Sequence, residues 1–245
     1  MTVGTREQVT HFMRELRTDL EAFMSKTSVL VFDMDSVLAE VSGSYLATIS
    51  ATVMHFTGKD VSSELIADYK KAGGWNNDWA LAQKLVLDLG QRDVPYPEVV
   101  QVFQSYFLGA NNDGLITRET WIPANGLLSR LASEHALAIF TGRIRLEVDI
   151  TLARFAPEVE WASIITDDDV ANGKPAPDGL HAIAAAHPGC TLTYVGDNVD
   201  DARSARAAGV RFIGVADGDE QLGQILKREG AVAVIASVNE LEEVL

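Results

Sequence analysis

The sequence VLVFDMDS, residues Val29–Ser36, decides how this chain is expected to fold. Its first four residues are all apolar, which is typical of a strand that is covered on both faces in a parallel sheet. Two aspartates, Asp33 and Asp35, follow at the point where this strand would end. Open parallel sheets bind ligands at the carboxyl ends of their strands, and residues two apart in an extended chain point the same way. The stretch therefore predicts a buried first strand that delivers two carboxylates to one site.

Short apolar runs of the same kind recur further along the chain. They are Leu137–Phe140, Ala162–Ile165, Leu192–Val195, Phe212–Val215 and Ala231–Ile235. Segments with helical spacing of apolar residues lie before and between these runs: Gly126–Ser133, Arg145–Phe155, Pro177–Ala186, Asp200–Ala208 and Gln221–Glu229. An alternation of strand and helix predicts an α/β fold, here a doubly wound, Rossmann-like and mainly parallel sheet.

The long interval between the first and second predicted strands has no strand pattern. It contains four helical stretches, each followed by a glycine where a C-cap is expected: Ser44–Phe56, Val61–Ala72, Asp78–Leu89 and Pro97–Leu108, with Gly58, Gly73, Gly90 and Gly109. We therefore predict a small α-helical domain at residues 42–117, called the insert below. The α/β core then comprises residues 1–41 and 118–245. We expect residues 1–27 to form an extra N-terminal helix that either packs on the core or makes a dimer contact.

Composition and charge exclude several classes of protein. The 245 residues are 47% hydrophobic and 22% charged, which is ordinary for a globular protein. A net charge of −15 opposes binding to nucleic acid or to an anionic membrane. One cysteine, Cys190, cannot form an internal disulfide, and the first 27 residues lack the apolar segment of a signal peptide. We expect a cytoplasmic monomer or homodimer that binds neither nucleic acid nor membrane.

Polar residues follow two further predicted strands. Thr141, Gly142 and Arg143 come after Leu137–Phe140, while Asp197 and Asp201 come after Leu192–Val195, and Lys174 lies in the loop between. This inventory suits a phosphate group. Carboxylate oxygens hold Mg²⁺, lysine and threonine bind phosphoryl oxygens, and an aspartate can attack phosphorus. We expect a small phosphorylated molecule as the substrate.

The same residues make the chain similar to the haloacid dehalogenase superfamily, which consists mostly of Mg²⁺-dependent phosphatases. Its four signatures occur in order as Asp33-x-Asp35, Thr141, Lys174 and Gly196-Asp197-x-x-x-Asp201. An insert between the first two signatures resembles the phosphoglycolate-phosphatase-like branch, whose insert is a helical cap. Three features depart from the usual pattern: Ser36 stands where glycine is common, the second signature reads Thr-Gly-Arg, and the N-terminal helix is additional.

The resemblance implies a role for each matching residue. Asp33 would be the nucleophile that forms an aspartyl-phosphate and a ligand of Mg²⁺. Asp35 would protonate the leaving alkoxide and then activate water, with its backbone carbonyl also reaching the metal. Thr141 and Lys174 would bind the phosphoryl group. Asp197 would be a direct metal ligand and Asp201 an outer carboxylate of the metal site.

Other residues have two interpretations each. Arg143 would contact the substrate phosphate or form a surface ion pair. Asp167–Asp169 would form a solvated loop and helix cap, or an outer shell around the metal. Trp75, Asn76 and Asn77 lie between two helices of the insert. They would recognise the leaving group of the substrate by hydrogen bonds and stacking. Alternatively, the tryptophan would anchor the insert while an asparagine caps the next helix.

The sequence thus predicts a Mg²⁺-dependent phosphatase that acts on a small phosphate monoester. A hexose-phosphate mutase shares the core signatures and is the alternative. A non-catalytic phospho-accepting or binding module is less favoured, because receiver modules lack an insert and place the accepting aspartate on their third strand.

Overall fold

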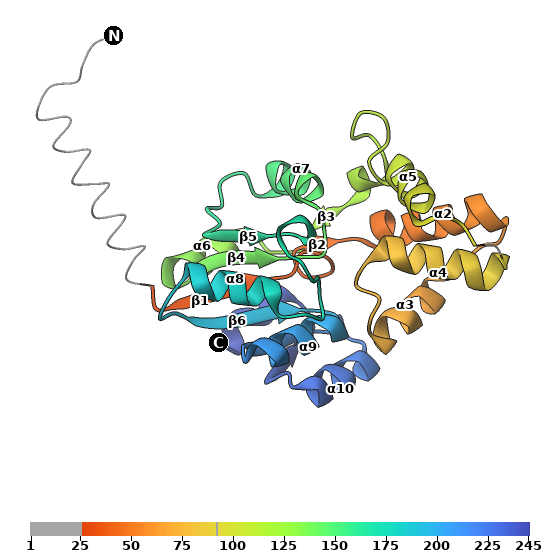
Figure 1. Ribbon diagram of the computed structural model, residues 1–245. Coiled ribbons are helices and arrows are strands. Elements are labelled where there is room, and N and C mark those ends of the chain that lie inside the picture. The colour runs from red at the N-terminus through yellow and green to blue at the C-terminus, as the bar shows by residue number, and fades with distance from the viewer. Residues whose placement is uncertain (1–25, 92) are drawn as a thin grey trace, which may run out of the picture.

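The computed structural model describes residues 26–91 and 93–245, and within them the sheet is parallel and open (Figure 1). Its strand order is β5-β4-β1-β6-β7-β8. The strand bounds are β1 Ser28–Phe32, β4 Ala136–Phe140, β5 Ser163–Ile165, β6 Thr191–Gly196, β7 Arg211–Val215 and β8 Ala233–Ile235. The predicted α/β, Rossmann-like fold is confirmed. The helix predicted for residues 1–27 falls almost entirely outside the described residues.

Helices cover both faces of this sheet, so the strands are apolar on both sides. The helices of the core are α6 Leu127–Glu134, α7 Arg145–Phe155, α8 Asp178–Ala186, α9 Val199–Ala208 and α10 Glu220–Glu229. Along β1, Leu30 and Phe32 pack in a cluster with α6 and α7, whereas Val29 and Val31 pack in another with α8, α9 and α10. Burial on both faces explains why the strand sequences are continuous apolar runs rather than alternating ones.

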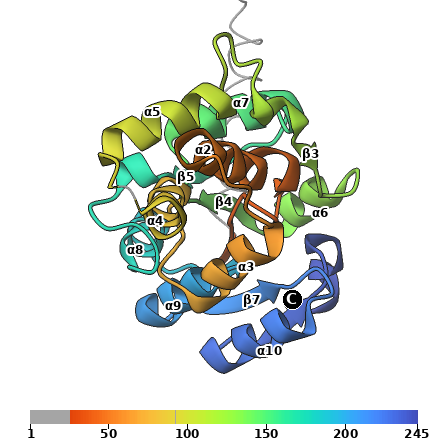
Figure 2. The ribbon, with the colours of Figure 1, turned by 90° about the vertical axis from the view of Figure 1, so that its right-hand side faces the viewer.

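Four helices fill most of the segment between the first core strand and the rest of the sheet. They are α2 Ala47–Thr57, α3 Ser63–Ala72, α4 Asp78–Gly90 and α5 Tyr96–Phe107. Their buried side chains form a hydrophobic cluster separate from the two around the sheet. The four helices lie beside the carboxyl edge of the sheet, as Figure 2 shows from that side.

The prediction that a glycine caps the C-terminus of each of these helices is correct only in part. Gly58 ends α2 in the left-handed conformation at φ 67°, which glycine adopts without strain. The third of these four helices, α4, differs from expectation. It continues through Gly90, and the left-handed residue is Gln91 at φ 52°. The reason is that the amide of Gln91 still bonds to Leu87, so the helical hydrogen-bond pattern ends one residue later.

Two short strands pair where the chain leaves the core and where it returns. β2 (Ala39–Glu40) and β3 (Thr120–Trp121) are antiparallel neighbours. The sequence analysis missed them, because two-residue strands are too short to show a period. Short helical turns complete the described chain: η1 Ser42–Leu46, η2 Leu115–Arg118, η3 Asp167–Asp169 and η4 Val238–Glu243.

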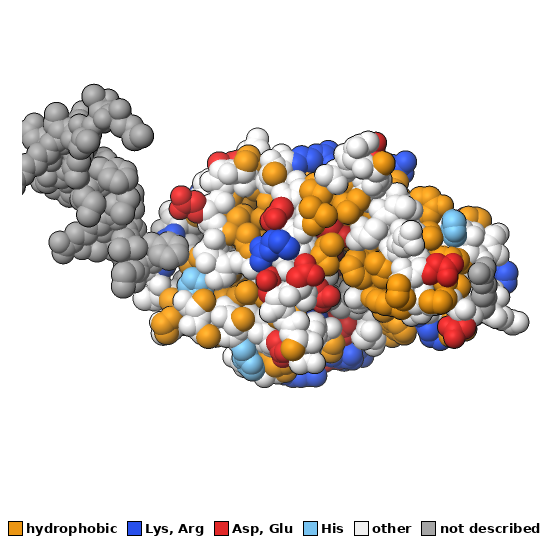
Figure 3. All heavy atoms as spheres, turned by 45° about the horizontal axis from the view of Figure 1, so that its top comes forward, with side chains coloured by type: hydrophobic (Ala, Val, Ile, Leu, Met, Phe, Trp, Pro, Cys, Tyr) orange, Lys and Arg blue, Asp and Glu red, His pale blue; other side chains and the backbone are white. Residues whose placement is uncertain are grey.

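The surface mixes charge with apolar side chains. On the face in Figure 3, acidic and basic groups are interspersed, and the hydrophobic side chains are most extensive toward the insert. Among the described residues, every helix is too short or too polar to cross a bilayer.

Candidate active site

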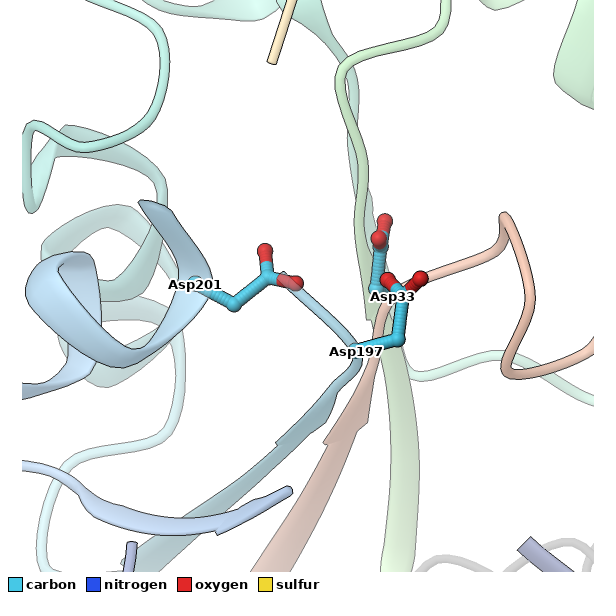
Figure 4. A group of neighbouring side chains, drawn as sticks. All are labelled: Asp33, Asp197 and Asp201. Atoms are coloured by element: carbon cyan, nitrogen blue, oxygen red, sulfur yellow. The ribbon is translucent and has the colours of Figure 1, made fainter. Parts of the chain in front are cut away.

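Three aspartates converge at the carboxyl edge of the sheet (Figure 4). Asp33 follows β1, Asp197 follows the neighbouring strand β6, and Asp201 lies in the first turn of α9. One carboxylate oxygen of each lies within 4.8 Å of the others. The backbone amide of Asp33 donates to the carbonyl of Val195 at 2.9 Å, so strand pairing places Asp33 beside the end of β6.

Lys174 balances part of this negative charge. Its Nζ is 2.8 Å from a carboxylate oxygen of Asp33 and 2.7 Å from one of Asp201, and its side chain is buried. Asp201 also accepts hydrogen bonds from the Tyr194 hydroxyl and the Asn198 amide. Because both Asp201 oxygens are engaged by the protein, Asp33 and Asp197 are the carboxylates of this cluster with freedom to bind a ligand.

The carboxylates exceed the charge that one lysine can offset. Burial and the neighbouring Asp201 and Asp35 raise the pKa of Asp33 from 3.8 to about 7, against the lowering effect of Lys174. Burial, Asp201 and Asp33 likewise raise the pKa of Asp197 well above its usual range. A divalent cation with a preference for oxygen ligands would relieve this repulsion, and all three groups are carboxylates. The donor set therefore fits Mg²⁺.

A cavity of about 370 Å³ opens onto the cluster. From the core it is lined by Asp33, Asp35, Gly142 and Asp197, among other residues, and from the insert by Lys70, Asn76, Asp78 and Trp79. Thr141, Lys174 and Asp201 are buried behind this lining. The Thr141 hydroxyl accepts the amide of Arg143 at 3.2 Å.

Arg143 is neither at the surface nor free. Its side chain is 1% exposed and pairs with Asp35 and with Glu119. The surface ion pair considered for Arg143 is therefore wrong, because residues of α7 and of both connections to the insert enclose the guanidinium. The sequence analysis missed Glu119 altogether, since nothing in the sequence links it to a residue so far along the chain.

Residues of the loop before α4 differ in whether they line the cavity or support the insert. Asn76 lines the cavity and lies over Gly142, where a Cβ would approach the Asn76 amide nitrogen to 2.5 Å. Asn77 also borders the cavity, but its Oδ1 caps α4 by accepting the Ala80 amide at 3.0 Å. Trp75 packs edge-to-face on Tyr69 and lies outside the cavity lining.

The insert adds cavity residues that the sequence analysis did not single out. Trp79 borders the cavity in place of Trp75. Lys70 forms an ion pair with Asp78 at 2.7 Å. Their sequence spacing carries no motif, so only packing could identify them.

The acidic run before Lys174 is held by local contacts. Asp168 accepts the amide of Arg145, and Asp169 accepts the amide and hydroxyl of Thr166. These bonds match the interpretation of Asp167–Asp169 as a loop with a capping role. Asp33, Asp197 and Asp201 form the carboxylate cluster instead.

The fold and this site define an α/β protein with a cluster of carboxylates at the carboxyl edge of a parallel sheet. Residues 30–215 match the family model of the haloacid dehalogenase-like hydrolases, and the chain belongs to that family.

The chain is also similar to individual proteins. The chain is 34% identical over 229 residues to an imidazoleglycerol-phosphate dehydratase from Phytophthora nicotianae, with 86% of this chain aligned but only 50% of that protein. It is 27% identical over 196 residues to the pyrophosphatase PpaX from Bacillus pumilus (strain SAFR-032), covering 78% of this chain and 84% of that one. A haloacid dehalogenase-like hydrolase from Bacteroides fragilis shares the fold with a TM-score of 0.72 and 22% identity, covering 88% of this chain and all of that one.

Proposed function

We propose that this hydrolase is a Mg²⁺-dependent phosphatase that cleaves a small-molecule phosphate monoester through an aspartyl-phosphate. The observation that carries the proposal is the cluster of Asp33, Asp197 and Asp201, in which Lys174 pairs with Asp33 and Asp201, beside a cavity large enough for a small ligand. In this proposal residues 42–117 form a cap domain over a core of residues 1–41 and 118–245.

Each step of the reaction has a group on this chain. A carboxylate oxygen of Asp33 forms a bond to phosphorus as the bond to the leaving oxygen breaks. Asp35 donates a proton to that oxygen and later takes one from the water that hydrolyses the acyl phosphate. Lys174 keeps Asp33 in place, and Thr141 and Gly142, which directly follow β4, would bind the phosphoryl oxygens.

Asp33, Asp197 and the backbone carbonyl of Asp35 would hold the metal, with Asp201 outside them. Mg²⁺, when bound, supplies positive charge that stabilises the phosphoryl group during transfer.

A panel of phosphate monoesters, assayed with and without Mg²⁺, tests this function. We expect turnover of at least one alkyl phosphate only with the metal, and loss of turnover after chelation. Ca²⁺ should bind and raise the melting temperature but inhibit, because its looser coordination does not hold an in-line geometry. Full activity after exhaustive chelation would contradict the proposed metal requirement.

The panel should also contain the substrates of the alternatives. Pyrophosphate and imidazoleglycerol phosphate are included because the names of the two relatives point to them. A hexose phosphate tests the mutase. Inorganic phosphate release from it identifies a phosphatase, whereas an isomeric hexose phosphate without net phosphate release identifies a mutase.

Asn76 and Asn77 form a matched pair for a test of leaving-group recognition. Asn76→Ala should lower kcat/KM for the best alkyl ester by about tenfold or more, since one hydrogen bond is worth roughly 1–3 kcal/mol when its loss leaves a buried group unpaired. For 4-nitrophenyl phosphate, whose leaving group needs little help, the change should be small.

Asn77→Ala is expected to act on stability instead. It removes the α4 cap and should cost about 1 kcal/mol of unfolding free energy. Equal kinetic losses on both substrates for Asn76→Ala would mean that the loop supports only the shape of the insert.

A further inference from the structure

Asp35 accepts two hydrogen bonds from Arg143. Arg143 donates to Asp35 Oδ1 from Nε at 2.8 Å and from Nη2 at 2.6 Å. Both bonds end on the same oxygen, so Oδ2 keeps its own bonding capacity. A planar guanidinium that donates two hydrogen bonds to one carboxylate oxygen restricts the orientation of the carboxylate, and so the position of its other oxygen.

Arg143 is itself held from three sides. Glu119 pairs with its Nη2 at 2.9 Å, and the Thr151 hydroxyl accepts from its Nη1 at 2.8 Å. The guanidinium carbon lies 4.9 Å from the centre of the Tyr45 ring. Glu119 and the Arg143 side chain are each 1% exposed, so water does not compete for these contacts.

These supports lie at the connections between core and insert. Tyr45 belongs to η1, which begins two residues after β2 ends, and Glu119 immediately precedes β3. Thr151 also donates to Glu119 at 2.8 Å, which ties the returning chain to α7. The position of Arg143 therefore depends on both connections between the core and the insert.

We propose that Arg143 is a positioning residue that holds Asp35 for proton transfer, and that Tyr45 and Glu119 make this hold depend on how the insert is seated. The inference rests on the proposed acid–base role of Asp35. It differs from phosphate binding by Arg143, because the guanidinium donors already bond to protein groups.

Leaving-group dependence separates positioning from structural support. An alkyl phosphate needs the proton from Asp35, whereas 4-nitrophenyl phosphate releases a stable phenolate without it. Arg143→Lys keeps the charge but cannot place two fixed donors on one oxygen. We expect single-turnover cleavage of the alkyl ester to fall by about 100-fold, within the range that general acids contribute.

For the same variant, we expect the burst of nitrophenolate to stay within about threefold of wild type, since this step needs no acid. The aspartyl-phosphate should then accumulate, because its hydrolysis uses Asp35 as the base. Glu119→Gln should show a weaker version of the same pattern. Arg145→Lys is the matched control, because Arg145 pairs with Asp169 outside the cavity and should leave both substrates unchanged.

A double variant completes the test. In an Asp35→Asn background, Arg143→Lys should cause no further loss on the alkyl ester, because the residue that it positions is already gone. The role of Arg143 would be overturned if the losses of Asp35→Asn and Arg143→Lys multiply in the double variant. Equal losses of Arg143→Lys on both substrates, or no loss on either, would also overturn it. In each case an active wild type would leave the proposed phosphatase function standing, whereas an inactive wild type would refute both.

Discussion

Asp33→Asn will abolish turnover of phosphate monoesters without unfolding the protein. The amide has the shape of the carboxylate but lacks the nucleophilic oxygen, so neither the aspartyl-phosphate nor product should form. We expect kcat to fall by several orders of magnitude, measured as phosphate release. Asp149→Asn, at an exposed position of α7, is the matched control and should keep full activity.

Although Asp33→Asn should lose activity, it should not lose stability. The folded-state pKa of Asp33 is raised from 3.8 to about 7, so the folded protein binds this proton more tightly than the unfolded chain does. In metal-free protein, the stability that the protonated group provides is full below the ordinary pKa and is lost as pH rises to about 7.

Asp33→Asn removes this dependence. Its melting temperature at pH 8 should equal or exceed that of the metal-free wild type. Retention of more than about a tenth of wild-type turnover would show that another group is the nucleophile.

Lys174→Met should produce the largest loss of stability. The substitution removes the cation between Asp33 and Asp201 and leaves two buried carboxylates facing each other. Breaking a buried ion pair from one side costs about 3–5 kcal/mol, and we expect a loss of that size in denaturant unfolding. Activity should fall by about 10²–10³-fold, as when one charge-stabilising donor is removed from an active site.

A second substitution shows whether charge is the cause. Lys174→Met/Asp201→Asn removes one of the two carboxylates and should recover much of the lost stability. Lys84→Met is the matched control, because the Lys84–Asp88 pair on α4 is partly exposed, so that water and salt screen it and its loss should cost far less stability than the loss of Lys174. If the two single variants lose equal stability, Lys174 is not a buried charge partner.

The relation of sequence to structure differs between the sheet and the site. Each of the six strands in the described sheet overlaps a predicted apolar run, because strands of a sheet covered on both faces are mainly apolar. Asp33 and Asp197 were placed together for a related reason. Both directly follow strands of one parallel sheet, and the ends of such strands share an edge.

Contacts between residues far apart in the chain could not be predicted from local sequence patterns. Arg143 was interpreted as a substrate ligand or a surface residue, yet it meets Asp35 and Glu119 in the interior. Trp75 was interpreted as a contact for the leaving group or an anchor of the insert, yet it packs on Tyr69, and Trp79 borders the cavity instead. Asn77 became the cap because helix α4 begins directly after it.

The sequence by itself determined the α/β class, the helical character of the insert and the strand-end carboxylates, because each is encoded within a few neighbouring residues. Tertiary structure alone decided the strand order, the pairing of β2 with β3 and the network around Arg143. These features join residues that are far apart in the chain, and their geometry depends on how the insert packs against the core.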